Sequence, residues 1–188
     1  METPQVNETA RKEKSPKGSA LFEWYDSLVF ALTVIVLIFV FLVRIITVSG
    51  NSMNPTLNWG DRIAVQSALY TPQRGDVVVV DSYSHYGDPL VKRVIAVGGD
   101  TLDIHFDTGD VILNGEILEE PYILAPTTDA ADVTFPLEVP EGCVFVMGDN
   151  RPGSLDSRST DIGFIDARDI LGKVVLRVAP IRDFGLIA

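Results

Sequence analysis

Residues 27–48 read SLVFALTVIVLIFVFLVRIITV, a run in which Arg44 is the only charged residue. At 1.5 Å per residue, a helix of this length spans about 33 Å, close to the thickness of a bilayer's hydrocarbon core. A chain of 188 residues has too little else to surround a helix that is apolar on every face. The run therefore predicts one transmembrane helix over residues 26–48, with Arg44 near the end where a long side chain reaches the interface.

The polar segment before this run predicts its orientation. Residues 1–25 contain four Lys or Arg residues, and such a bias places that side of a span in the cytoplasm. The composition of this tail indicates disorder. Because the apolar run is longer than a usual signal core and no A-x-A-like site follows it, we expect an uncleaved signal anchor. The expected protein crosses the cytoplasmic (plasma) membrane once, with residues 49–188 outside the cytoplasm.

The outer segment, residues 49–188, is acidic. It holds 10 Lys or Arg against 21 Asp or Glu and accounts for the net charge of −11. This excess excludes nucleic acid as an expected partner, because phosphate binding needs a basic face. Cys143 is the only cysteine, so no intrachain disulfide can form, and we expect neither a metal nor a cofactor.

Short β-type runs separated by turn signals fill the chain from residue 61 onward. Asn114-Gly115 lies between apolar flanks, which is the strongest short-range signal for a hairpin. Residues 123–141 have the weakest pattern and are expected to form a long exposed loop. The predicted fold is mostly β, a domain of coiled antiparallel sheets preceded by one transmembrane helix. The β-type runs are residues 61–70, 75–83, 89–99, 101–106, 109–118, 142–149 and 170–180.

Three segments carry residues suited to catalysis, although each has a plain structural reading. Residues 49–57, S-G-N-S-M-N-P-T-L, are either a linker or a turn whose backbone N–H groups face an oxyanion beside Ser52. On a strand, Lys92 shares a face with Val94 and Ala96. Taken alone, that segment favours a structural lysine, but a desolvated amine has a lowered pKa and can deprotonate a serine.

The third segment is residues 147–158, M-G-D-N-R-P-G-S-L-D-S-R, which is dense in turn formers and in charges of both signs. It is either a loop braced by ion pairs or a loop whose serine hydroxyl orients the lysine amine, as the third group of a triad does.

Together these segments resemble the type I signal peptidases, the bacterial leader peptidase family. Four boxes of that family occur here in order, at residues 49–56, 74–79, 92–100 and 148–158. The resemblance covers nearly all of the chain from the helix onward, including G-D-V-I-L-N-G-E-I-L-E-E-P-Y. The single anchor, together with Gly50 where members with two spans often carry serine, resembles the Gram-positive branch.

The resemblance implies a Ser/Lys dyad with Ser52 as nucleophile and Lys92 as general base, and with Ser154 hydrogen-bonded to the lysine amine. The Ser52 N–H and the position of Gly50 would form the oxyanion hole. Some relatives use histidine as base, but His85 and His105 lie outside the base position. The remaining implied residues are Arg93, Asp149, Asp156 and Arg158 as structural support, and Val48, Met53, Leu57 and Val91 as walls of substrate pockets.

The implied enzyme is a membrane-bound serine endopeptidase that removes signal peptides from exported preproteins after a small-x-small motif. Its expected partners are these preproteins, the lipid bilayer and, further, the protein translocation machinery. Trp59 is as consistent with the membrane interface as with packing inside the domain.

Two other classes of protein are consistent with parts of the pattern. Self-cleaving repressors of the DNA damage response share a Ser-Lys dyad on a β fold, but the apolar run and the acidic domain exclude them. A membrane-tethered β module that binds preproteins or translocon parts without catalysis stays open. It predicts that Ser52 and Lys92 can both be replaced without loss of function.

Overall fold

The computed structural model describes residues 17–68, 70–81, 89–129 and 132–187, with the backbone alone for residues 17–21 and 38–42. The chain divides into two units, Met1–Ile38 and Phe39–Ala188. The described strands are β1 (Val43–Thr47), β2 (Arg62–Gln66), β3 (Val77–Val80), β4 (Leu90–Val97), β5 (Thr101–His105), β6 (Asp110–Leu113), β7 (Glu116–Ile117), β8 (Leu137–Glu138), β9 (Cys143–Met147), β10 (Ile165–Asp166), β11 (Ile170–Ala179) and β12 (Gly185–Leu186).

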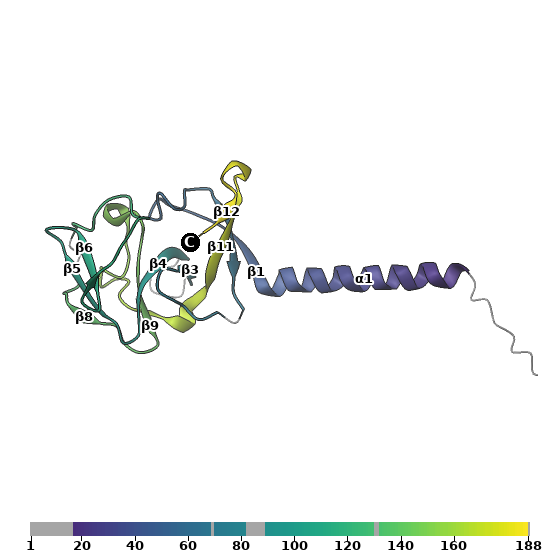
Figure 1. Ribbon diagram of the computed structural model, residues 1–188, viewed down its shortest axis with the longest axis horizontal. Coiled ribbons are helices and arrows are strands. Elements are labelled where there is room, and N and C mark those ends of the chain that lie inside the picture. The colour runs from purple at the N-terminus through teal and green to yellow at the C-terminus, as the bar shows by residue number, and fades with distance from the viewer. Residues whose placement is uncertain (1–16, 69, 82–88, 130–131, 188) are drawn as a thin grey trace, which may run out of the picture. The chain divides into compact units, whose positions relative to one another are not determined.

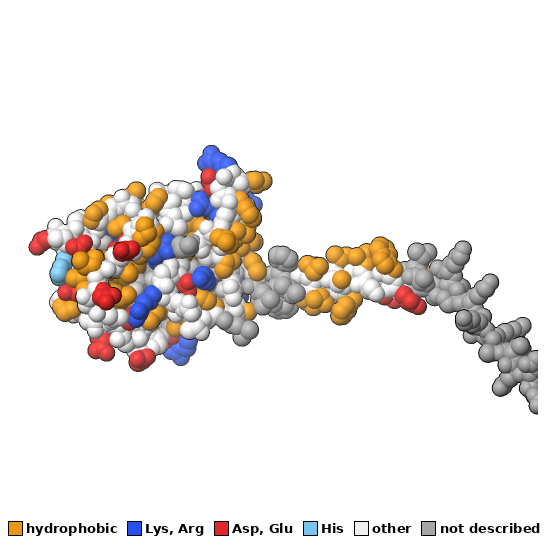
Figure 2. Space-filling view, viewed as in Figure 1, with side chains coloured by type: hydrophobic (Ala, Val, Ile, Leu, Met, Phe, Trp, Pro, Cys, Tyr) orange, Lys and Arg blue, Asp and Glu red, His pale blue; other side chains and the backbone are white. Residues whose placement is uncertain are grey.

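One α-helix, α1 (Lys17–Leu42), contains most of the apolar run. The side chains described on it, from residue 22 to residue 37, are exposed and mostly hydrophobic, with acidic residues only toward the N-terminal end (Figure 2). Among the described residues, no helix combines the length and hydropathy that crossing a bilayer requires.

The helix differs from the predicted span at both ends. The expected tail, residues 1–25, is already helical from Lys17, whereas residues 1–16 lie outside the described part. At the other end the helix stops at Leu42, and β1 pairs antiparallel with β2 instead of continuing the predicted span to residue 48. Ile45, Ile46 and Thr47 are β-branched, which favours a strand once a partner strand is available.

The second unit is built from two antiparallel sheets, and the β-rich fold expected from the sequence is confirmed. One sheet has the order β1-β2-β11-β3-β4-β9-β10, with β12 paired to β11. The other has the order β7-β6-β5-β8. In Figure 1, β5, β6 and β8 lie together at one end of this unit, away from β11 and β12. The described part of this unit also contains the 3-10 turns η1 (Arg151–Gly153), η2 (Ala167–Asp169) and η3 (Ile181–Asp183).

Each predicted β-type run contains at least one strand, and the predicted hairpin forms between β6 and β7, with Leu113 opposite Glu116. The stretch 123–141 is less exposed than expected. It contains β8, and it buries Thr127 completely and Val139 almost completely. The sequence did not predict this burial, because contacts with distant segments produce no hydrophobic periodicity within the segment itself.

Three clusters of buried hydrophobic side chains form the core in the described part of the β unit. One lies beneath the segment between β1 and β2, which holds Ser52, and a second lies between β3, β4 and β9. The third joins the second sheet to β4 and β9. Strand β4 contacts all three clusters, so its polar side chains are surrounded by core.

Candidate active site

Lys92 is almost completely buried, although a lysine normally extends its amine into water. Its Nζ lies 3.2 Å from Ser154 Oγ, to which it donates a hydrogen bond. Burial disfavours the ammonium form and lowers the pKa of Lys92 to about 8. The carboxylates of Asp156 and Asp149 oppose this shift, whereas the guanidinium of Arg158 adds to it. The result is an amine that is partly neutral near physiological pH.

The face of β4 that carries Lys92 differs in part from the face predicted by simple alternation along a strand. Lys92 is paired with Val78 of β3, and Val78 shares a buried cluster with Val94. The register then shifts between Val94 and Ala96, and Ile95 and Ala96 both pack in another cluster. The predicted shared face is therefore wrong for Ala96, because a bulge interrupts the period-two alternation.

Ser52 lies half-buried in the turn-rich segment between β1 and β2. Its backbone carbonyl accepts a hydrogen bond from the Asn150 N–H at 2.9 Å, and the Asn150 side chain donates to the Asn51 carbonyl at 3.1 Å. Gly50 has φ of +100°, a conformation that a side chain would strain. This backbone gives a physical reason for glycine where members with two spans often carry serine.

Gly148 marks the place where the two serine segments meet. A Cβ atom at this position would overlap both the Ser52 carbonyl oxygen and the Ser154 side chain. Because Lys92 Nζ donates to this Ser154 side chain, the contacts around Gly148 connect the lysine with both serine segments. In the part of the chain that the structure describes, no hydrogen bond joins the Ser52 hydroxyl to the Lys92 amine.

The loop of residues 148–158, which carries Ser154, is braced from inside. Asp156 receives two hydrogen bonds of 2.9 Å from the Arg158 guanidinium, and the Gly148 N–H donates to the same carboxylate at 3.0 Å. Arg158 also donates to the Arg151 carbonyl at 2.7 Å. These contacts are charge-assisted and lie away from water, so they hold the loop in one shape.

Arg93, the neighbour of Lys92, forms a buried pair with Asp149 through two hydrogen bonds of 2.9 Å. It also donates to the Gly75 carbonyl at 2.7 Å, and its guanidinium lies 3.9 Å from the centroid of the Tyr122 ring. Thr56, four residues after Ser52, donates a hydrogen bond from its hydroxyl to Asp149 Oδ2. This ion pair thus connects β4, the Ser52 segment and the Ser154 loop.

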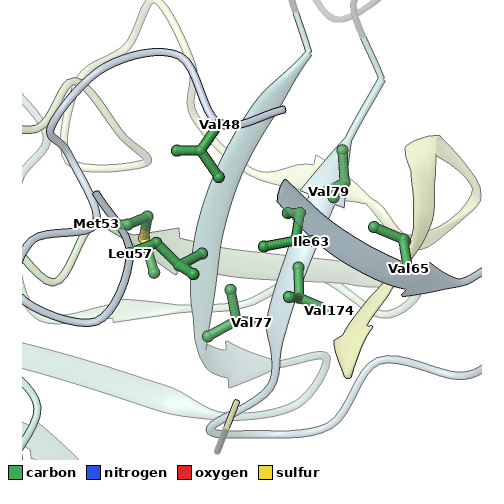
Figure 3. Close-up of a cluster of buried hydrophobic side chains, with 8 residues drawn as sticks. All are labelled: Val48, Met53, Leu57, Ile63, Val65, Val77, Val79 and Val174. Carbon is green, nitrogen blue, oxygen red and sulfur yellow. The ribbon is translucent and has the colours of Figure 1, made fainter. Parts of the chain in front are cut away.

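The four residues expected to line substrate pockets lie in or against one cluster. Val48, Met53 and Leu57 are buried there with residues of β2, β3 and β11, and Val91 packs against the cluster from β4 (Figure 3). Figure 3 shows Met53 and Leu57 close together on the segment that carries Ser52.

The other singled-out residues lie elsewhere. His105 is exposed at the end of β5, and Trp59 is exposed after the Ser52 turn, so the packing alternative for Trp59 is wrong. His85 lies outside the described residues. Within the described residues, no group of three or more His, Cys, Asp or Glu side chains is placed to hold a metal ion.

Several residues without a role in the sequence analysis contact the site. Arg151 donates to the Gly148 carbonyl, and Glu120 and Tyr122 contact Arg151 and Arg93 respectively. Glu120 and Tyr122 belong to the E-E-P-Y stretch, which is part of the family resemblance. Only this resemblance could have indicated from the sequence that the two residues lie near the site. Their pairing with residues about thirty positions away could not be read from spacing.

Several known proteins are similar to most of this chain. The family described as "Signal peptidase, peptidase S26" matches residues 21–179. A signal peptidase I of Bacillus licheniformis is 38% identical over 86% of this chain and 90% of its own length. Signal peptidase IB of Staphylococcus aureus is 35% identical over 87% and 92%, and a probable signal peptidase I-2 of Synechocystis is 32% identical over 97% and 84%.

Among solved structures, a signal peptidase I from Enterococcus faecalis is 32% identical, covers 57% of this chain and 99% of its own, and has a TM-score of 0.48. The family match extends from the helix to the end of β11, and the curated relatives align over most of their own length. The chain therefore belongs to the signal peptidase family, peptidase S26.

Proposed function

We propose that this chain removes signal peptides from exported preproteins with a dyad in which Ser52 is the nucleophile and Lys92 the general base. As a member of its family, the chain is a serine endopeptidase, a hydrolase that removes signal peptides. The observation that carries the dyad is the buried Lys92 amine, whose pKa is lowered to about 8 and which contacts Ser154 beside the Ser52 backbone.

The reaction begins when neutral Lys92 takes the proton from Ser52 Oγ. The resulting alkoxide attacks the carbonyl carbon of the last residue of the signal peptide, and the carbonyl π electrons move to the oxygen as an oxyanion. Collapse of this intermediate breaks the C–N bond, and the lysine ammonium gives its proton to the leaving amine. Water, deprotonated by the same lysine, then attacks the acyl-enzyme carbonyl. The ester C–O bond breaks, the signal peptide leaves as a carboxylic acid, and the lysine ammonium returns its proton to Ser52 Oγ.

Backbone N–H groups of the Ser52 segment are the proposed oxyanion donors. The Ser52 N–H donates one hydrogen bond to the oxyanion. The second donor is proposed to lie at the turn of Gly50. One donor of this kind contributes about 3–4 kcal/mol of transition-state stabilisation. Ser154 keeps the Lys92 amine in place, and the ion pairs of Arg93 with Asp149 and of Asp156 with Arg158 support both loops.

The bilayer is the proposed site of action, with the apolar part of α1, which ends at Leu42, as a single anchor, the N-terminus in the cytoplasm and the catalytic domain outside. Sharing a membrane with the preprotein raises the effective concentration of substrate. The domain itself exposes large apolar side chains beside the end of β11 and on the segment that follows it. These are Trp59, Ile181, Phe184 and Leu186, each more than half exposed. The translocation machinery that delivers preproteins is a further proposed partner.

A small-x-small cleavage pattern is proposed because Val48, Met53, Leu57 and Val91 form an apolar cluster next to Ser52. Because this cluster is closely packed, we expect room beside Ser52 for a short side chain such as Ala but not for larger ones.

The test of this function is cleavage of a purified preprotein by the detergent-solubilised full chain, with the product N-terminus identified by mass spectrometry. We expect one cut, after an Ala-x-Ala sequence at the end of the signal peptide. A matched substrate with Leu in place of the last Ala should be cleaved at least about a hundredfold more slowly. Absence of cleavage, or cleavage that ignores this residue, would contradict the proposal.

Cleavage should also rise with pH through about 8. Lys92 is a base only when neutral, and burial lowers its pKa from the usual value of about 10.4. The neutral fraction therefore grows as pH rises through the lowered pKa, and activity is lost as pH falls through it. The check is kcat/KM for a preprotein-derived peptide between about pH 6 and pH 11, where the acid limb should fall about tenfold per pH unit. An ascending limb near pH 10 would show that Lys92 is not desolvated.

A further inference from the structure

The segment of residues 118–127, here called the strap, connects the second sheet to the loop that carries Ser154. The strap leaves β7, and its Leu118 N–H donates to the Val111 carbonyl at 2.8 Å. At its other end the Thr127 N–H donates to the Gly109 carbonyl at 3.2 Å. Both ends are therefore attached to β6 or to the turn before it, and the middle is free to contact other parts of the domain.

The middle of the strap forms a buried ion pair with the Ser154 loop. Both carboxylate oxygens of Glu120 accept hydrogen bonds from the Arg151 guanidinium, and both side chains are almost completely buried. Arg151 also donates to Thr127 Oγ1 at 2.6 Å and to the Gly148 carbonyl at 3.0 Å. A buried guanidinium keeps its position only while its partners remain, since an unpaired charge away from water is strongly unfavourable.

The same strap contacts the second ion pair of the site. The Tyr122 ring lies against the Arg93 guanidinium, and the Tyr122 hydroxyl donates to Glu120 at 3.1 Å. The Leu124 N–H donates to the Asp149 carbonyl at 2.9 Å. One short segment thus touches β4 next to Lys92 and the loop that presents Ser154.

These contacts give the strap a role that the internal bonds of the loop cannot supply. Arg158 and Asp156 hold the loop in shape, and Arg158 also binds the Arg151 carbonyl, so the loop moves as a unit. The ion pair between Arg151 and Glu120 helps to hold this loop against β4, on the side that carries Lys92.

We propose that Glu120 is a positioning residue, which acts through Arg151 to hold the Ser154 hydroxyl at the Lys92 amine. This role rests on the proposed Ser/Lys function. Loss of the Glu120 charge lets Arg151 leave Gly148, so that Ser154 is no longer aimed at the amine. Because positioning matters most in the transition state, the loss should appear in kcat rather than in KM.

The experiment is a double-mutant cycle in the detergent-solubilised full chain. Glu120→Gln, which is isosteric and uncharged, is compared with Glu119→Gln, the exposed neighbour, each with Ser154 present and in the Ser154→Ala background. We expect Glu120→Gln to lower kcat about tenfold or more with KM changed less than about threefold, and Glu119→Gln to change neither. In the Ser154→Ala background, Glu120→Gln should change kcat by less than about threefold, because its target is already gone.

If Glu120→Gln lowered kcat by the same factor in both backgrounds, the proposal would be overturned and Glu120 would be a purely structural residue. The proposal would also be overturned if Glu120→Gln and Glu119→Gln had the same effect on kcat. Thermal unfolding shows whether the variant is folded. If Glu120→Gln does not fold, Thr127→Val removes another Arg151 partner with nearly the same shape and is put through the same cycle. Failure of the proposed function is a separate result, because the unmodified chain would then not cleave preprotein at all.

Discussion

Ser52→Ala is expected to abolish signal-peptide cleavage while leaving the fold and preprotein binding in place. Removal of the nucleophile of a serine protease lowers kcat by about a millionfold, because no other group at that position can form the acyl-enzyme. Ser52 is half-buried, and the change removes one oxygen atom while the Ser52 backbone, which binds Asn150, is unchanged, so we expect the fold to persist. The measurement is single-turnover cleavage of a labelled preprotein, with thermal unfolding as the check on folding.

Ser49→Ala is the matched control for this variant. Ser49 is an exposed serine on the same segment, three positions earlier, and its replacement should leave kcat/KM within about twofold of the unmodified chain. Cleavage that persists in Ser52→Ala would move the nucleophile elsewhere. Signal-peptide processing in cells that needs this chain but not Ser52 would favour the non-catalytic module that binds preproteins.

Lys92→Arg is expected to lower kcat by about three orders of magnitude or more, although charge and length are nearly kept. A guanidinium stays protonated at every pH at which the protein is folded, so it cannot take the Ser52 proton. Burial makes the case stronger: the site that lowers the pKa of Lys92 to about 8 offers no water to a permanent cation. We therefore expect no recovery of activity as pH rises, in contrast to the rise through about 8 for lysine.

Lys173→Arg provides the control for the same chemical change. Lys173 lies on β11, is only partly buried and pairs with Asp76, an arrangement that a guanidinium can keep. Its replacement should leave kcat and the pH profile unchanged. If purified Lys92→Arg cleaves preprotein with an ordinary ascending limb, the base lies elsewhere, and His85 and His105 would be the first residues to replace.

The β-rich fold and the order of the chemical segments were accessible from the chain alone. The strands follow from short runs of β-branched residues between turn formers, and the β6–β7 hairpin follows from Asn114-Gly115, because both signals act within a few residues. The boundary after Leu42 was not accessible. An apolar β-branched run suits a helix or a strand, and pairing with β2, about twenty residues later, decided between them.

The site divides in the same way. The sequence predicted Ser52, Lys92 and Ser154 through boxes that resemble those of the family, and it indicated that a lysine among aliphatic residues needs a special environment. Only the tertiary structure decided that Lys92 is buried and that both serine segments meet at Gly148. It alone connected Glu120 with Arg151 and Tyr122 with Arg93. Burial and ion pairing depend on which distant segments fold together, and the spacing of residues along the chain does not determine which of these segments come into contact.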